Sequence, residues 1–350
     1  MDVRKKTRMI DVAGIKIGGD ASIIIQSMTN TDTRDIKATC AQINALDEAG
    51  CEIVRVAIPD MEAANAVKEI KKGIRLPLVA DIHFDYRLAL EVMKNGIDKL
   101  RINPGNIGGI EQVKMVAAMA KEQSIPIRIG VNSGSLEKDL VKKYRGITPD
   151  GLVESALRHV RILESLDFFD ICISIKSSNI PTTVDSYVSL SEKVDYPLHV
   201  GITEAGTIWS GSIKSAAGIG AILSRGIGDT IRVSLTGDPV QEVYCAKEIL
   251  KSMRLRKFGI EFTSCPTCGR THIDLISIAN EVEKRCAAIN KNLHVAVMGC
   301  AVNGPGEAKD ADIGVAGGYG CGVIFKKGEV FRKVDEADLI DILIEEIEKM

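Results

Sequence analysis

Short apolar runs recur along the first two thirds of the chain, and each is followed by a segment with helical periodicity. Every run is six or seven residues long and contains Ile, Val or Leu, as buried β-strands do. Successive runs begin 21 to 44 residues apart, which fits one strand, one helix and two short loops per unit. We therefore predict eight strands, at 22–27, 52–57, 77–83, 98–103, 126–132, 170–176, 198–203 and 229–234.

The segments between these strands indicate helices, as in 39–50, where apolar residues fall at helical spacing and Gly50 ends the pattern. Eight strand–helix units predict a (β/α)8 barrel of the TIM type. A doubly wound open sheet is less favoured, because it usually has fewer strands and a glycine-rich first turn, which 29–33 lacks. The long fifth interval leaves 133–150 as a lid or an added helix on the face where barrel active sites lie.

The pattern changes after the last predicted barrel helix, at 240–257, where glycine, cysteine and short strands become frequent. We assign 1–257 to the barrel and 258–350 to a smaller α+β domain. The expected elements of this second domain are helices at 273–289 and 336–349 and strands at 293–298, 312–315 and 322–326. Residues 7–18 read as a hairpin that plugs the bottom of the barrel.

Composition and charge narrow the class of protein. With 350 residues, 45% of them hydrophobic and 26% charged, the chain can bury two cores and is not a disordered chain. Its 45 basic and 47 acidic residues give a net charge of -2, so no global field attracts nucleic acid or anionic lipid. No segment has about 18 consecutive apolar residues, and no apolar stretch follows the basic start at 1–9. We expect a cytoplasmic protein without membrane contact.

Polar and charged residues occupy one parity of the predicted strands, where barrels usually carry branched apolar side chains. Members of each set are two or four residues apart, so each set shares one face of its strand. The residues are Arg55, Asp81, His83, Arg101, Asn103, Arg128, Asn132, Ser174, Lys176, Ser178, His199, Arg232 and Ser234. Converging cations repel one another unless an anion neutralises them, so this pattern predicts a site for a diphosphate or a similarly dense anion.

Two carboxylates at predicted strand ends, Asp81 and Glu204, allow two interpretations. Facing a ligand, they are the best candidates for general acid and base. Alternatively, they are ion-pair partners within a purely structural network of the barrel cations.

Nine cysteines with only one close pair argue against a disulfide framework in a cytoplasmic protein. Cys265 and Cys268 form a C-x2-C pair, and Cys300 follows in a segment rich in glycine and proline, so three thiolates could converge on a metal. Zinc would need a fourth closed ligand, for which His272, Cys286 and Cys321 are candidates. The incomplete cysteine count favours an iron–sulfur cluster with one replaceable ligand.

Four other cysteines fall in barrel elements and read as small buried residues: Cys40, Cys51, Cys172 and Cys245.

Three segments together carry a resemblance to a known family. They are Cys265-Pro-Thr-Cys268 followed by Gly-Arg-Thr, the stretch MGCAVNGPGE at 298–307, and QSMTNT at 26–31. The chain closely resembles the 4-hydroxy-3-methylbut-2-enyl diphosphate synthase family along essentially its whole length. Because 350 residues leave no room for a large inserted domain, it is similar to the short two-domain form.

The resemblance implies a [4Fe-4S] oxidoreductase of the non-mevalonate isoprenoid pathway. Such enzymes reductively open 2-C-methyl-D-erythritol 2,4-cyclodiphosphate and remove a hydroxyl, with two electrons from ferredoxin or flavodoxin. The implied cluster ligands are Cys265, Cys268, Cys300 and Glu307, of which the spacing alone does not indicate Glu307. The implied diphosphate pocket is Arg55, His83, Arg101, Asn103, Arg128, Asn132, Lys176, Arg232 and Ser234. The resemblance also implies a head-to-tail homodimer in which one subunit's cluster domain covers the other's barrel.

Two competing functions fit the same residues. One is a pterin- or phosphate-binding barrel transferase with a structural zinc module, since the barrel alone also suggests enzymes similar to dihydropteroate synthase. The other is an iron–sulfur redox sensor whose barrel is only a scaffold. Metal analysis separates zinc from iron, and turnover of the cyclodiphosphate with a strong reductant separates an enzyme from a sensor.

Overall fold

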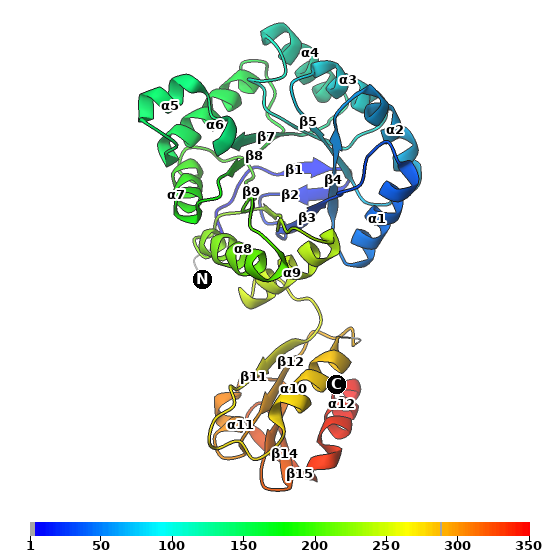
Figure 1. Cartoon of the computed structure of the whole chain (residues 1–350), viewed down its shortest axis with the longest axis vertical. Helices are drawn as coiled ribbons and strands as arrows, with labels where there is room; N and C mark the ends of the chain where they lie inside the picture. The colour runs from blue at the N-terminus through cyan, green and yellow to red at the C-terminus, as the bar shows by residue number, and fades with distance from the viewer. Residues whose placement is uncertain (1–3, 288) are drawn as a thin grey trace. The chain divides into compact units, whose positions relative to one another are not determined.

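The computed structural model describes residues 4–287 and 289–350. The chain divides into two compact units, Met1–Arg256 and Lys257–Met350, which are described separately below (Figure 1). Among the described residues, no helix combines the length and the apolar character that a membrane span requires.

The first unit is a parallel eight-stranded barrel, which confirms the predicted fold (Figure 1). The strand order is β8-β7-β6-β5-β4-β3-β10-β9, and a bridge between Ile173 and Leu198 brings the two ends of this order together. The strands are β3 (Ile24–Met28), β4 (Ile53–Ile58), β5 (Leu78–Ile82), β6 (Lys99–Ile102), β7 (Ile127–Asn132), β8 (Ile171–Lys176), β9 (His199–Val200) and β10 (Thr230–Ile231). Their Ile, Val and Leu side chains are buried, as the hydrophobic runs predict.

Eight helices follow these strands and surround the barrel (Figure 1). They are α1 (Ile36–Glu48), α2 (Met61–Lys72), α3 (Tyr86–Lys94), α4 (Ile110–Glu122), α6 (Pro149–Glu164), α7 (Ile180–Ser191), α8 (Ile208–Leu223) and α9 (Pro239–Ser252). Several begin at a side-chain cap; for example, Asp60 accepts a hydrogen bond from the backbone of Ala63. The long fifth interval contains an added helix, α5 (Lys138–Tyr144), after a short 3-10 turn at Ser133–Ser135.

The N-terminal hairpin closes the lower end of the barrel. Its strands β1 (Ile10–Val12) and β2 (Ile15–Ile17) pair antiparallel around a turn at Ala13 and Gly14, both of which have positive φ. The hairpin side chains of Ile10, Val12 and Ile17 pack in one apolar cluster with side chains at or near the start of four barrel strands. The barrel residues are Ile24, Ile53, Val79 and Cys172. The hairpin therefore acts as the predicted plug.

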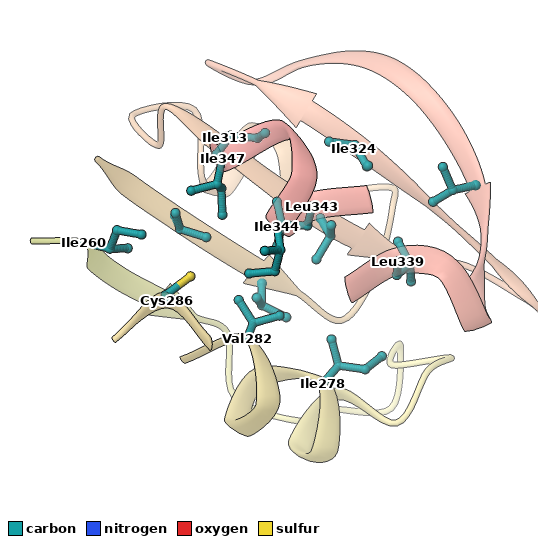
Figure 2. Packing of buried hydrophobic residues seen from close by; sticks show 14 of the residues in the cluster. Ile260, Ile278, Val282, Cys286, Ile313, Ile324, Leu339, Leu343, Ile344 and Ile347 are labelled. Carbon is teal, nitrogen blue, oxygen red and sulfur yellow. The ribbon is translucent and has the colours of Figure 1, made fainter. Parts of the chain in front are cut away.

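The second unit is a five-stranded mixed sheet in the order β11-β12-β13-β14-β15. The strands are β11 (Glu261–Ser264), β12 (His294–Met298), β13 (Ile313–Gly317), β14 (Cys321–Lys326) and β15 (Glu329–Asp335). Helices α10 (Leu275–Cys286) and α12 (Leu339–Lys349) bury side chains such as Val282, Leu343 and Ile347 against the sheet (Figure 2). A further one-turn helix, α11 (Gly304–Glu307), follows β12.

The predicted boundaries of this unit need three corrections. Strands β11 and β15 were not predicted, because most of their side chains are partly or largely exposed and lack a clear apolar alternation. Helix α10 begins at Leu275, where Asp274 caps it, rather than at residue 273. The closing helix begins at Leu339, because Glu336–Asp338 forms a 3-10 turn. The expected end of α10 near 289 spans residue 288, which lies outside the described residues.

The chain leaves the first unit at the lower end of the barrel. Arg256 donates hydrogen bonds from Nη1 to the carbonyl of Ile23 at 2.8 Å and to Oε2 of Glu52 at 2.6 Å. Ile23 and Glu52 directly precede β3 and β4, so these bonds fix Arg256 at the end opposite the carboxyl ends of the strands.

Candidate functional site

The carboxyl ends of the barrel strands surround a cavity of about 360 Å³. A volume of this size suits a small molecule. The lining residues are Arg55, Asp81, His83, Arg101, Asn132, Ser133, Gly134, Ser135, Lys176, Thr203, Glu204 and Arg232. Strand parity predicted seven of these twelve residues, and Glu204 was predicted as a carboxylate at a strand end. The other four lie in the loops after β7 and β9: Ser133, Gly134, Ser135 and Thr203.

Asp81 is the central carboxylate of this cavity. Its Oδ1 accepts a hydrogen bond from Nη1 of Arg101 at 2.9 Å, and its Oδ2 lies 3.6 Å from Nε of Arg55. Nε2 of His83 lies 3.4 Å from the same carboxylate. Burial raises the pKa of Asp81, but Arg55, the hydrogen bond with His83, and Arg101 outweigh burial and hold it well below its usual range. Asp81 is therefore an ionised partner of the arginines.

The cations exceed the acids that contact them. Arg232 pairs with Glu242, whose Oε1 lies 3.5 Å from Nη2, while Asp81 serves both Arg55 and Arg101. In the described part of the chain, Nε of Arg101 and Nε of Arg232 are buried without a hydrogen-bond partner. The pKa of Lys176 is lowered, mainly because the side chain is buried and also because the surrounding arginines repel its charge. A bound anion would supply the missing partners and remove much of this repulsion.

Arg128 lies within the barrel, outside the residues that line the cavity. It is fully buried, and none of its three guanidinium nitrogens has a hydrogen-bond partner among the described residues. Burial lowers its pKa to about 10. Arg128 on β7 is the register partner of Arg101 on β6, so the positive charge extends inward from the cavity.

Gly130 is a site residue that the sequence reasoning missed. A Cβ atom at this position of β7 would lie 2.4 Å from Nε of Arg101, so only glycine leaves room for that guanidinium group. A glycine inside a strand often marks such a close approach, and this signal was present in the run at 126–132.

Five other predicted residues do not line the cavity. Asn103 accepts a hydrogen bond from the backbone of Gly105, and Nδ1 of the buried His199 lies 2.7 Å from Oγ1 of Thr230. Ser174 is buried and bonds to the carbonyl of Ile129. Ser178 and Ser234 lie beyond the ends of β8 and β10, where the two-residue alternation no longer fixes side-chain direction.

In the second unit, the predicted metal ligands follow neighbouring strands. Cys265 comes directly after β11, and Cys300 lies two residues after β12. These strands are parallel, with Ser264 opposite Val297, so both loops leave the same edge of the sheet. The backbone N–H of Gly299 donates a 3.1 Å hydrogen bond to Sγ of Cys265, as at thiolates of iron–sulfur sites. Glu307 ends α11 in the segment that follows Cys300.

The donor atoms of this edge suit a soft metal centre. Cys268 is exposed, and a backbone hydrogen bond from Arg270 lowers the pKa of its thiol, which favours the thiolate form. Cys286 is excluded as a ligand, because it lies in the apolar core and burial raises its pKa to about 11. Within residues 4–287 and 289–350, no three His, Cys, Asp or Glu side chains share a metal-binding position. The fold thus brings the loops of Cys265 and Cys300 to one edge of the sheet.

Comparison with known proteins agrees with both units. The GcpE TIM-barrel domain model matches residues 7–247, and the GcpE protein C-terminal domain model matches residues 261–349. The chain is 63% identical over 347 residues to 4-hydroxy-3-methylbut-2-en-1-yl diphosphate synthase (flavodoxin) of Clostridium acetobutylicum, covering 99% of each chain. It is 60% identical to the protein of the same name from Geobacter sulfurreducens, with the same coverage.

A solved structure supports the barrel assignment. The crystal structure of Yersinia pestis dihydropteroate synthase superposes with a TM-score of 0.52 at 13% sequence identity, covering 71% of this chain and 99% of the other. At this identity the likeness concerns the fold alone.

The space at Gly130 gives a testable prediction. Gly130→Ala should weaken binding of inorganic pyrophosphate by roughly ten- to a hundredfold, because the added methyl group displaces the Arg101 guanidinium. Isothermal titration calorimetry measures the change. Gly220→Ala on the outer helix α8 is the matched control, since its Cβ would meet only Sδ of Met253 at 3.9 Å. Equal affinity in the two variants would contradict the role of Arg101.

Proposed function

The chain belongs to the GcpE family, and we propose that its barrel mouth binds the diphosphate of the substrate while its second unit holds an iron–sulfur cluster. Its reaction is the reductive conversion of 2-C-methyl-D-erythritol 2,4-cyclodiphosphate to 4-hydroxy-3-methylbut-2-enyl diphosphate, in the non-mevalonate isoprenoid pathway. The chain is thus an oxidoreductase that takes its electrons from flavodoxin.

The surplus of buried positive charge carries the proposal for the substrate site. Arg55, Arg101, Lys176 and Arg232 line one cavity, and Arg128 lies inside the barrel without a partner among the described residues. A guanidinium group can donate two hydrogen bonds to a phosphate at once. These hydrogen bonds become stronger as negative charge develops on the departing diphosphate. The side chains of Asn132, Ser133 and Ser135 supply orienting hydrogen bonds at the rim.

Cys265, Cys268, Cys300 and Glu307 are the residues we propose for the [4Fe-4S] cluster. The soft thiolate donors, the N–H···S bond to Cys265 and the lowered pKa of Cys268 fit such a group. When bound, the cluster supplies single electrons and a Lewis-acidic iron for the departing oxygen. Glu307 would be the one oxygen donor of the set, and a hard carboxylate would be a weaker ligand to the cluster than the three thiolates.

The two candidate acids have different surroundings. Asp81 is buried between arginines that keep it ionised, so it orients Arg55 and Arg101 and holds no proton to give. Glu204 is exposed, lines the cavity and follows β9 with a φ of 54°, a conformation that non-glycine residues rarely adopt. We propose that the Glu204 carboxyl supplies the proton to the leaving oxygen.

The exit of the chain from the barrel favours a site built by two subunits. Arg256 is fixed at the end of the barrel opposite the cavity. Cys265, which belongs to the second unit, follows only nine residues later in the chain. We propose a head-to-tail homodimer in which the partner's cluster unit covers this mouth. Both units carry strongly exposed apolar side chains. Phe84 follows β5 and Trp209 lies in the first turn of α8, whereas Val302 and Tyr319 lie in loops of the cluster unit.

The ligand assignment predicts loss of the cluster from one variant. Cys300→Ala should abolish the visible absorption and lower the iron content after anaerobic reconstitution, because one thiolate anchor is gone. Cys321→Ala is the matched control: this thiol begins β14 and should be dispensable for the cluster. Iron bound as well by Cys300→Ala as by the wild type would overturn the ligand set.

The assignment of the proton donor separates two further variants. Glu204→Gln should reduce kcat by roughly a hundredfold or more, because the amide cannot deliver the proton. Asp81→Asn should reduce kcat much less, because the ionised Asp81 carboxylate donates no proton and its replacement only changes how Arg55 and Arg101 are held. Single-turnover kinetics of the reconstituted proteins measure both. The reverse order of the two effects would assign the proton to Asp81.

The dimer proposal predicts complementation between inactive subunits. Cys300→Ala lacks a cluster and Arg128→Ala lacks an intact anion site, yet a mixed head-to-tail dimer contains one complete site. After mixing and reassociation in equal amounts, activity should return to roughly a quarter of the wild-type value, because half the dimers are mixed and each has one site. No recovery, with mixed dimers verified by mass, would place each site within one subunit.

A further inference from the structure

His159 is a buried residue of the barrel unit that the proposed reaction does not use. It lies on α6 with 3% of its surface exposed, and neither ring nitrogen has a hydrogen-bond partner in the part of the chain that the structure describes. Its Nε2 lies 3.2 Å from Oε1 of Glu137, at ion-pair distance. Burial lowers the pKa of the ring. Glu137 acts in the opposite direction and raises it, whereas the positive charge of Arg158 lowers it further. A buried polar ring with so few partners requires a reason.

One side of this ring packs against the loop that follows β6. A Cβ atom at Gly105 would lie 2.5 Å from Cε1 of His159 and 3.5 Å from Oδ1 of Asn103. The N–H of Gly105 donates a 3.0 Å hydrogen bond to that same Oδ1. The ring therefore touches the backbone turn that orients Asn103, directly after the strand of Arg101.

The other side of the ring reaches the loop that follows β7. Glu137 comes two residues after Ser133–Ser135, all three of which line the cavity, and it precedes the first residue of α5. One side chain from α6 thus contacts both loops that rise from β6 and β7. These strands carry Arg101, Arg128 and Asn132.

We propose that His159 is a positioning residue that holds the 103–109 and 133–137 loops in place, and with them the substrate contacts at the mouth. It acts through Gly105 and Glu137 and touches no reacting atom. The inference rests on the proposed binding of the cyclic diphosphate at this mouth. Loss of the ring should therefore weaken substrate binding more than it slows the chemical steps.

The test is a double-mutant cycle on reconstituted enzyme. His159→Ala should raise KM for the cyclodiphosphate roughly tenfold and change kcat less than about twofold. Gly105→Ala should do the same, because its methyl group occupies the place of the ring edge; Gly105 has no left-handed φ, so alanine suits its backbone. In the double variant, Gly105→Ala should add less than about a twofold further change, since the ring it displaces is absent.

Controls separate this inference from folding and from the proposed function. Arg161→Ala, on the exposed side of the same helix, should leave KM and kcat unchanged. Thermal unfolding of each variant reports any loss of fold, and if His159→Ala does not fold, Gly105→Ala alone decides the outcome. Unchanged KM in the single variants, or fully additive effects, would overturn the role of His159. Absence of turnover by the wild type itself would instead count against the proposed function.

Discussion

Unneutralised positive charge inside the barrel is the constraint on which the site depends. A (β/α)8 barrel usually fills its interior with branched apolar side chains, whose burial stabilises the fold. Here Arg55, Arg101, Arg128 and Lys176 occupy that interior, and burial lowers the pKa of Arg55, Arg128 and Lys176 because desolvation disfavours their charged forms. The hydrophobic hairpin below and the shell of helices outside must carry the fold in the absence of ligand. An anion that binds only the folded barrel adds stability by mass action.

Much of the barrel and its site could be predicted because both follow simple periods. Strand spacing indicated the eight units, and the two-residue alternation placed most of the cavity lining on the inner face. Alternation did not settle every position: Ser174 lies inside β8 yet bonds to the carbonyl of Ile129 and does not line the cavity. Ser178 and Ser234 lie beyond their strands, and β9 and β10 are only two residues long, so parity there decides little. Gly130 was missed because it matters for the space it leaves rather than for a group it offers.

The second unit was less predictable from pattern. Its strand β15 exposes nearly every side chain, and β11 is short and polar, so neither produces an alternation. Spacing indicated three thiolates but not Glu307, because no spacing rule singles out a carboxylate on a one-turn helix as a proposed ligand. The family resemblance supplied that residue. What the sheet itself explains is why Cys265 and Cys300 share an edge: their strands are parallel neighbours.

The contrast between Asp81 and Glu204 shows how environment divides labour between similar groups. Both are carboxylates near the ends of inner strands, and the sequence offers no means of separating them. Asp81 is enclosed by two guanidinium groups and a histidine, so the cost of neutralising it exceeds the cost of burying its charge. Glu204 stands exposed on a strained backbone at the rim, where no such group fixes its charge among the described contacts. Because Asp81 stays ionised, it has no proton to give, and Glu204 is the carboxylate to which we assign that role in the proposal.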